Sequence, residues 1–255
     1  MQRVGLTHWR RGAASLVLAS STLALLPGCA SSPAAARPEV LLLGEQHDAP
    51  DHARRHLEAV RALALKGRLA ALALEMAEQG TSTHGLGQQA SEAQVRQALR
   101  WNEAAWPWAT YAPVVMAAVQ AGVPVLGANL PRSDMRAAMA DERLDAALSP
   151  SALERQRAAI REGHCDLLPA SQIAPMARVQ IARDRAMAAT LASTAQAGRT
   201  VVLVAGRGHV DPALGVPVHL PPGLSVEPVA WPLPAVAARD YCGELREQLL
   251  RKRGG

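Results

Sequence analysis

The 255-residue sequence contains no phenylalanine, only two tyrosines and five tryptophans. It also lacks a strong excess of charge of one sign, because the formal net charge is +5. Three of the positive charges belong to the N-terminal arginines Arg3, Arg10 and Arg11, so the rest of the chain carries only +2. A balance this small excludes nucleic acid as an expected partner.

The N-terminus lacks an apolar run long enough to span a bilayer as a mature helix. The basic residues are followed by an apolar run at 13–26 and then by small residues. A spanning helix needs about 20 apolar residues, whereas a basic start with a shorter apolar run is typical of a secretory signal. Residues 1–28 are therefore predicted to be an export signal.

This signal ends in Leu26-Pro27-Gly28-Cys29, which resembles a bacterial lipobox. The resemblance implies that Cys29 carries a lipid and becomes the mature N-terminus; the alternative is an ordinary cleavage site beside a chance cysteine. Residues 29–38 are mostly small residues and proline, and they predict a tether of at most roughly 30 Å. Neither Ala30 nor Ser31 is the aspartate of an inner-membrane retention signal, so the expected location is the outer membrane, on its periplasmic side.

Cysteine is scarce, and only Cys165 and Cys242 remain after Cys29. An oxidising periplasm would permit a disulfide between them. The sequence does not show whether the two residues meet.

Short apolar runs at 40–43, 70–74, 123–126 and 200–204 predict strands buried on both faces. Helical spacing is found between them, at 53–64, 92–99, 107–120, 133–148, 151–162 and 173–195. Asp48 is placed to cap the first of these helices, with Pro50 in its first turn. Strands separated by helices predict a single α/β domain at 39–222, with a mostly parallel sheet flanked by helices on both faces. After His209, proline and glycine punctuate the chain, and 216–220 and 224–229 predict edge strands. Residues 223–255 are predicted to be a small C-terminal extension, with a surface helix at 240–251.

Two strands end in the same pattern, Gly-x-x-His. It occurs in LLLGEQHD, Leu41–Asp48, and again in VLVAGRGH, Val202–His209. Ligands of open parallel sheets bind beyond the carboxyl ends of the strands. The polar residues expected at these ends are Glu45, His47, Glu75, Asn129, Arg132, Arg207 and His209.

Glu75 lies inside the apolar run LALEMA, where an ionised carboxylate is costly unless a cation or hydrogen-bond donors meet it. One interpretation is a structural ion pair with Arg54 or Arg55. The other is a functional cluster of Glu75 with Glu45 and the two histidines. Such a cluster has two chemical uses: His47, His209 and Glu75 are ligand types for a divalent metal, and without metal His47 can take a proton from water while Glu45 or Glu75 orients it.

An ordered series of motifs carries a family resemblance over residues 40–220. The motifs are GEQHD, LALEM, WPWATYAP, VPVLGANLPR, GHCDLLP, QIARDRAMA and VLVAGRGHVDPALGVPVHL. In this order they resemble the ChaN lipoproteins of the haem-binding uptake and Tiki superfamily. The resemblance implies haem binding, two haems stacked between two subunits, and tyrosine as the iron ligand.

The same resemblance implies relatives with other activities, the Tiki metalloproteases and the erythromycin esterases. Their functional residues correspond to Glu45, His47, Glu75 and His209, and to Arg54 or Arg55. Because superfamily membership does not choose among these activities, the function has to be argued from the site.

A haem site needs an apolar cleft, an axial ligand and cations for the propionates. Tyr111 is the expected ligand, because Trp101, Trp106 and Trp108 lie beside it in the sequence and could line a groove; the alternative is that these aromatics are core. His164 is a second candidate, as ligand or propionate partner, and Arg132 is a candidate propionate partner. Met176, Gln180, Arg183 and Met187 share one helical stripe that either forms structural contacts or touches a ligand.

The leading hypothesis is thus a haem-binding lipoprotein of iron acquisition, with an outer-membrane haem receptor and a second copy of the chain as expected partners. The alternative hypothesis is a hydrolase, with or without a divalent metal, that uses Glu45, His47, Glu75 and His209. A third is a binding or scaffold lipoprotein in which this polar cluster is a relic.

Overall fold

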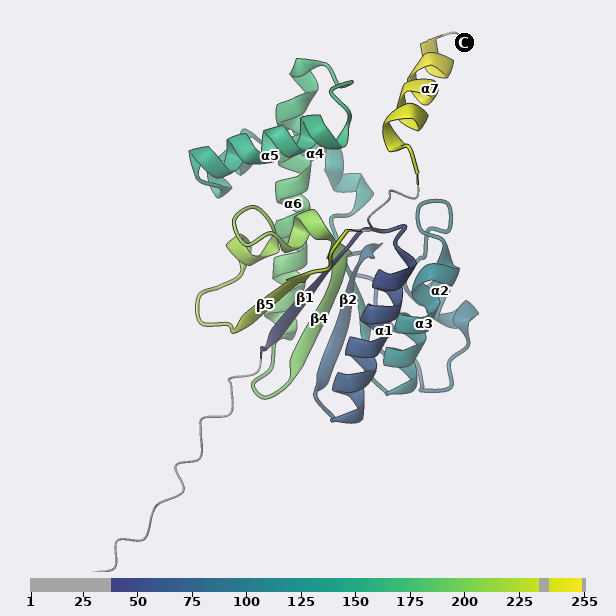
Figure 1. The fold of residues 1–255 in the computed structure, drawn as a ribbon. Coiled ribbons are helices and arrows are strands. Elements are labelled where there is room, and N and C mark those ends of the chain that lie inside the picture. The colour runs from purple at the N-terminus through teal and green to yellow at the C-terminus, as the bar shows by residue number, and fades with distance from the viewer. Residues whose placement is uncertain (1–37, 234–238, 254–255) are drawn as a thin grey trace, which may run out of the picture. The chain divides into compact units, whose positions relative to one another are not determined.

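A computed structural model describes residues 38–233 and 239–253 (Figure 1). The predicted export signal, the lipidation residue Cys29 and all of the tether except its last residue lie outside the described residues. Among the helices that are described, none is both long and apolar enough to cross a membrane.

Five strands form one sheet in which every strand pair is parallel. In the order β3-β2-β4-β1-β5, the strands are β3 (Val125–Asn129), β2 (Leu69–Glu78), β4 (Thr200–Gly206), β1 (Val40–Glu45) and β5 (Val226–Ala230). The predicted α/β fold with a parallel sheet is confirmed, and all four predicted core strands are present. Because β4 lies between β1 and β2, the carboxyl ends of three strands that are far apart in sequence become neighbours.

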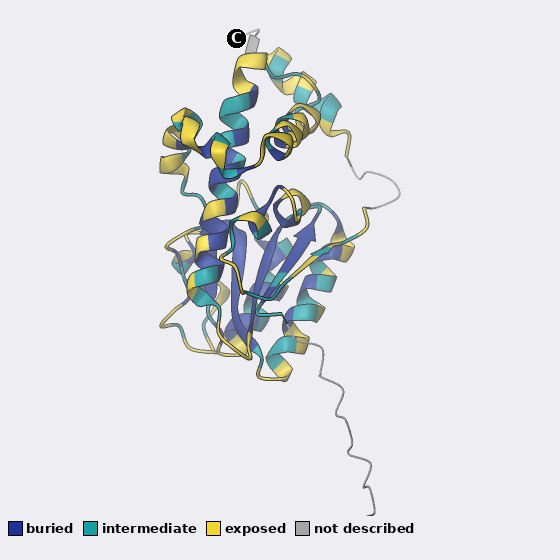
Figure 2. Cartoon of the chain, turned by 90° about the vertical axis from the view of Figure 1, so that its left-hand side faces the viewer, coloured by how far each residue is buried: buried dark blue, intermediate teal, exposed yellow. Residues whose placement is uncertain are grey.

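The alternation of side chains along the strands fills two apolar layers. In β4, Val202 and Val204 contribute to the layer on the side of α1 (Pro50–Leu65), α2 (Glu92–Ala98) and α3 (Trp108–Gln120). Val201 and Leu203 contribute to the opposite layer, against α6 (Ala170–Thr194). Each fully buried Val or Leu stabilises the fold by about 1.5–3 kcal/mol. Strands β1 to β4 therefore lie buried between helices, as the colouring in Figure 2 shows, whereas the edge strand β5 has no buried residue.

The helix α6 packs against two parts of the fold, the sheet and the helices beyond the strand ends. Met187 and Leu191, toward its end, pack on the sheet. Its earlier residues Ile173 and Ala177 pack with Ile160 of α5 (Pro150–Gly163), and Val179 packs in a cluster with residues of α4 (Met135–Ala140). Helices α4 and α5 consequently lie beyond the carboxyl ends of the strands (Figure 1).

Three local predictions are wrong. The single helix expected at 133–148 is broken into η1 (Arg132–Asp134), α4 and η2 (Glu142–Ala147), because Asp141 has an extended backbone (φ −84, ψ 91) and accepts a hydrogen bond from the N–H of Arg143. The edge strand expected at 216–220 is the 3-10 helix η4 (Val216–His219), where Pro217 has no N–H to give to a sheet. Asp48 does not cap α1, whose N-cap residue is Ala49 without a side-chain hydrogen bond.

The C-terminal extension is continuous with this fold. Its strand β5 pairs with β1, and it ends in the predicted helix, α7 (Tyr241–Arg253). Cys165 and Cys242 form a disulfide, which joins the start of α7 to the turn after α5. The sequence left this pairing open.

Candidate functional site

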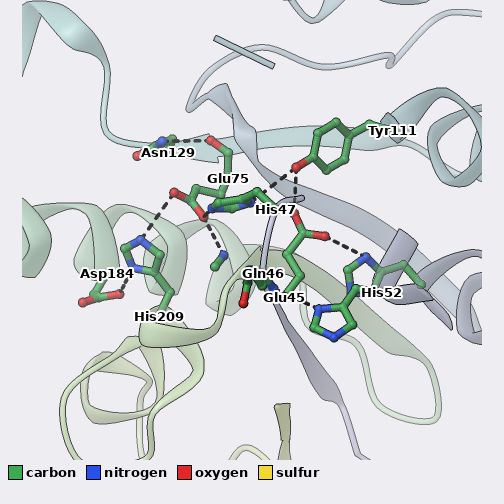
Figure 3. A network of polar contacts seen from close by, with 11 residues as sticks. Glu45, Gln46, His47, His52, Glu75, Tyr111, Asn129, Asp184 and His209 are labelled. Carbon is green, nitrogen blue, oxygen red and sulfur yellow. Dashed lines mark hydrogen bonds and ion pairs between the residues drawn. The ribbon is translucent and has the colours of Figure 1, made fainter. Parts of the chain in front are cut away.

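Five of the polar residues predicted at the strand ends, Glu45, His47, Glu75, Asn129 and His209, meet at the carboxyl edge of the sheet (Figure 3). Glu45 ends β1, Glu75 lies in β2, and His209 lies in η3 (Arg207–Val210), directly after β4. The Nε2 atom of His47 is 4.0 Å from Oε2 of Glu75, and Nε2 of His209 is 3.4 Å from Oε1 of the same carboxylate. Glu75 is therefore the centre of the cluster, with one histidine on each side.

Glu45 is buried and surrounded by hydrogen-bond donors. Its Oε1 atom accepts from the Tyr111 hydroxyl at 2.7 Å and lies 2.7 Å from Nδ1 of His47, and its Oε2 atom lies 3.1 Å from Nδ1 of His56. Burial alone would raise the pKa of Glu45, but the hydrogen bonds from His47 and His56 outweigh it and lower the pKa to about 2. Glu45 is thus a fixed carboxylate that orients His47.

His47 is the accessible member of the cluster, with 37% of its side chain exposed. Burial disfavours its charged form, but the hydrogen bond to Glu45 and the charge of Glu75 more than compensate and raise the pKa of His47 above its ordinary value of 6.5. The Trp106 ring packs against its edge, with the ring centroids 4.7 Å apart. Since Nδ1 donates to Glu45, the Nε2 atom of neutral His47 keeps its lone pair.

Glu75 is held in place by the backbone. Its Oε2 atom accepts a hydrogen bond from the N–H of Gly206 at 2.7 Å, and the side chain of Asn129 donates to its backbone carbonyl at 2.8 Å. Although burial opposes ionisation, the charges of His209 and His47 lower the pKa of Glu75 far below its ordinary range. A Cβ atom on Gly206 would lie 3.1 Å from Nε2 of His47, so a larger residue here would press against the His47 ring.

His209 lies between two carboxylates. Its Nδ1 atom is 2.6 Å from Oδ1 of Asp184, a buried residue of α6, and its Nε2 atom faces Glu75. Burial alone would lower the pKa of His209, but the charges of Glu75 and Asp184 raise it to about 10. Burial raises the pKa of Asp184, and the charge of His209 opposes this rise. With an acid on each ring nitrogen, His209 is an imidazolium at neutral pH.

In this protonation state, His47, His209 and Glu75 are not arranged as the predicted metal ligand set. The His209 imidazolium would have to lose a proton before it could ligate a metal, and Oε2 of Glu75 accepts a hydrogen bond from Gly206. Among the described residues, no group of three or more His, Cys, Asp or Glu side chains could hold a metal ion.

Three of the predicted arginines, Arg54, Arg55 and Arg132, take no part in the cluster. Arg54 and Arg55 pair with Asp51 on the exposed face of α1, so neither is the partner of Glu75 that the structural interpretation required. Arg132 donates its backbone N–H to Glu78 and does not line the cavity that adjoins the cluster.

That cavity, here called the site cavity, has a volume of about 1410 Å³. It exceeds the roughly 300–1,000 Å³ that is typical of small-molecule sites. Its floor includes the cluster, and its walls include Trp106 of the segment before α3, residues of α5 and α6, Arg207, and Tyr241 at the start of α7. His164 also lines it, with Nδ1 fixed at 2.8 Å from the carbonyl of Ile160.

Of the aromatic groups predicted to form the haem groove, Tyr111 and Trp106 line the site cavity and Trp101 and Trp108 do not. Tyr111 is only 2% exposed, and its hydroxyl is occupied by Glu45. Burial and the Glu45 charge raise its pKa far above the ordinary range, which disfavours a phenolate there. Trp101 and Trp108 pack edge to face with ring centroids 4.9 Å apart in the core beneath, so only Trp106 of the three tryptophans lines the cavity.

The residues predicted to share one stripe on α6 lie partly in the core and partly at the site cavity. Met187 is fully buried in the core, whereas Gln180 and Arg183 line the site cavity. Sequence reasoning missed Asp184, although an acid in an amphipathic helix that is apolar on the same side was a visible signal. It also missed His56, which the helical spacing of α1 places on the buried face.

Comparison with known proteins identifies a matching family and a solved structure with a similar fold. Residues 33–220 match the family described as "Haem-binding uptake, Tiki superfamily, ChaN". The fold resembles that of a solved structure described as "Cofacial heme binding to ChaN of Campylobacter jejuni", with a TM-score of 0.65 and 22% sequence identity, covering 78% of this chain and 84% of that one. No curated protein matches the sequence.

Proposed function

We propose that this chain, which belongs to the haem-binding uptake ChaN family of the Tiki superfamily, binds haem in the site cavity. The observation that carries the proposal is the cavity itself: it is large, it lies beyond the strand ends, and the chain shares its fold with a ChaN protein that binds haem cofacially. Bound haem would supply the iron and the macrocycle, while the protein supplies a ligand, apolar contacts and cations.

The residues of the cavity fit these needs. Trp106 offers an aromatic face, and Arg183 and Arg207 offer cations for propionates. The Nε atom of Arg183 is buried and has no hydrogen-bond partner among the described residues. A buried donor without a partner is unfavourable, so a carboxylate of a ligand would satisfy it.

The axial ligand we propose is Tyr241, in place of Tyr111. Both tyrosines line the cavity, but Tyr241 is 47% exposed, whereas Tyr111 is 2% exposed and its hydroxyl donates to Glu45. Burial and the neighbouring carboxylate of Asp48 raise the pKa of Tyr241 to about 12, so the phenol is protonated until a metal displaces its proton. His164, with Nδ1 bound to a carbonyl, presents Nε2 as the other candidate.

A hemin titration of three matched variants tests this assignment. Wild type and Tyr111→Phe should give the same saturable Soret band at micromolar hemin, while Tyr241→Phe should lose the charge-transfer band of a phenolate ligand and bind more weakly. An unchanged Tyr241→Phe spectrum with an altered His164→Ala spectrum would assign the iron to His164. Absence of a saturable band in wild type would refute haem binding.

We further propose that the chain is exported and lipidated at Cys29, and that it serves iron acquisition at the outer membrane with a haem receptor as partner. The lipobox-like sequence supports this placement. Labelled palmitate should enter the wild-type chain and not Cys29→Ser. A homodimer around two haems is part of the same proposal; sedimentation with and without hemin should show dimer formation on loading.

A hydrolase is the second candidate function, favoured by the pairing of Glu45 with His47. In this reading neutral His47 takes a proton from water through Nε2, and Glu45 stabilises the imidazolium that results. Because the base has to be neutral, turnover should rise with pH through a pKa above 6.5. His47→Ala should lower turnover of an ester or peptide substrate by about 10²–10⁴-fold. The exposed His84→Ala serves as the matched control, and a folded wild type without turnover on a broad panel would exclude this activity.

A further inference from the structure

The C-terminal segment supplies one wall of the site cavity. Arg239 and Tyr241 line the cavity together with His164, which follows α5. The part of the chain that matches the family ends at residue 220. This wall is therefore built from residues outside the matched region.

Little apolar burial holds this wall in place. None of the residues 241–251 of α7 is buried, and Leu250 is 68% exposed. An element with so few buried contacts separates from its domain at low free-energy cost. By contrast, a covalent bond holds the start of α7, because Cys242 is bonded to Cys165. Cys242 directly follows Tyr241, and Cys165 directly follows His164, so the bond lies next to two residues that line the cavity.

The backbone beside the disulfide is strained. Cys165 and Asp166 have φ angles of 55° and 56°, in the left-handed region that residues other than glycine rarely adopt. Such a conformation persists where the surroundings fix it. Here the N–H of Cys165 donates to Glu162, the N–H of Asp166 donates to Arg161, and the disulfide adds the third constraint. Opening the bond removes the covalent constraint that reaches across to α7.

We propose that the Cys165–Cys242 disulfide is a redox-sensitive latch that holds the start of α7 against the site cavity. With the bond formed, Arg239 and Tyr241 stay at the cavity. A dithiol reductant gives two electrons and two protons, becomes a disulfide itself and leaves both cysteines as thiols. The start of α7 then loses its covalent tie and keeps only non-covalent contacts such as the hydrogen bond of Tyr241 to Asp48. The ligand that the latch retains is haem under the proposed function, on which this part of the inference rests.

Haem release from the full-length protein tests the latch. Oxidised wild type and the Cys165→Ser/Cys242→Ser variant are loaded with hemin and mixed with an excess of a haem-scavenging protein. Release should be on the order of tenfold faster from the variant. Without the disulfide, Arg239 and Tyr241 would lie at the cavity only part of the time, and haem could leave whenever they are away from it. Reductant should accelerate release from wild type and leave the variant unchanged, which separates an effect on the disulfide from one on the iron. Equal release from oxidised wild type and variant would overturn the latch.

Hydrogen exchange provides a second measurement that needs no ligand. On reduction, the amides of 241–251 should exchange about tenfold faster, while those of 150–160 in α5 stay protected. Unchanged exchange in α7 would overturn the latch even if haem binds. Failure of wild type to bind hemin would instead refute the proposed function, with the exchange measurement still deciding the latch.

Discussion

Asp184→Asn isolates the charge state of the cluster, because it keeps the shape of the side chain and removes the charge that faces His209. The Nδ1–Oδ1 distance is 2.6 Å, so the attraction is about 6 kcal/mol at an effective dielectric constant of about 20. Relief of the cost of burying the carboxylate offsets several kcal/mol of this. The amide oxygen still accepts a hydrogen bond, and Glu75 remains. We expect the free energy of unfolding at pH 6 to fall by about 2–3 kcal/mol.

The pH dependence of this loss has a definite sign. His209 has a pKa of about 10 in the folded protein against 6.5 ordinarily. Its stabilising effect is therefore complete below pH 6.5 and disappears as the pH rises through about 10. The difference between wild type and Asp184→Asn should accordingly shrink from about 2–3 kcal/mol at pH 6 to below about 1 kcal/mol at pH 10.

Urea unfolding at pH 6, 8 and 10 measures this difference, and an NMR titration of His209 in the folded protein gives its pKa directly. Asp145→Asn is the matched control, because Asp145 pairs with Arg178, and arginine does not titrate in this range. The loss in the control should not change with pH. A loss in Asp184→Asn that is equally independent of pH would show that His209 is neutral in the folded protein and would refute the imidazolium.

The remaining predictions concern the neighbours of the cluster. Glu45→Gln should lower the pKa of His47 toward 6.5 in an NMR titration, since the carboxylate that stabilises the imidazolium is gone; an unchanged pKa would contradict the pairing. Wild type should lose stability as the pH falls from 4.5 through about 2, where Glu45 becomes protonated, and acid unfolding of Glu45→Gln should lack part of this loss. Tyr111→Phe should cost about 1–3 kcal/mol in urea unfolding, because Glu45 loses a donor; no cost would show that this hydrogen bond is dispensable. Gly127→Ala should destabilise the fold by more than about 3 kcal/mol, because its Cβ would lie 2.0 Å from the backbone oxygen of Glu78; a thermal unfolding midpoint like that of wild type would contradict this.

Much of the architecture and the place of the site followed from local patterns. Apolar runs separated by helical spacing predicted the parallel sheet, and the rule that ligands bind at the carboxyl ends of parallel strands predicted that Glu45, His47, Glu75 and His209 would meet. These inferences succeeded because they depend on periodicity along the chain and on strand direction. The broken helix at 133–148 and the missing strand at 216–220 depend on single backbone conformations, which periodicity does not encode.

By itself, the sequence determined that two histidines and two acids share one edge of the sheet, because each lies at or near the carboxyl end of a buried strand. Only the tertiary structure decided what they are chemically. Glu75 and Asp184, which reaches His209 from a helix, stabilise the imidazolium form of His209, and in that form it cannot act as a general base. Tyr111 and Tyr241 both border the cavity, but the hydroxyl of Tyr111 is bonded to Glu45, whereas Tyr241, next to the Cys165–Cys242 disulfide, is 47% exposed. Protonation and access depend on neighbours brought from distant parts of the chain, and no local pattern specifies those neighbours.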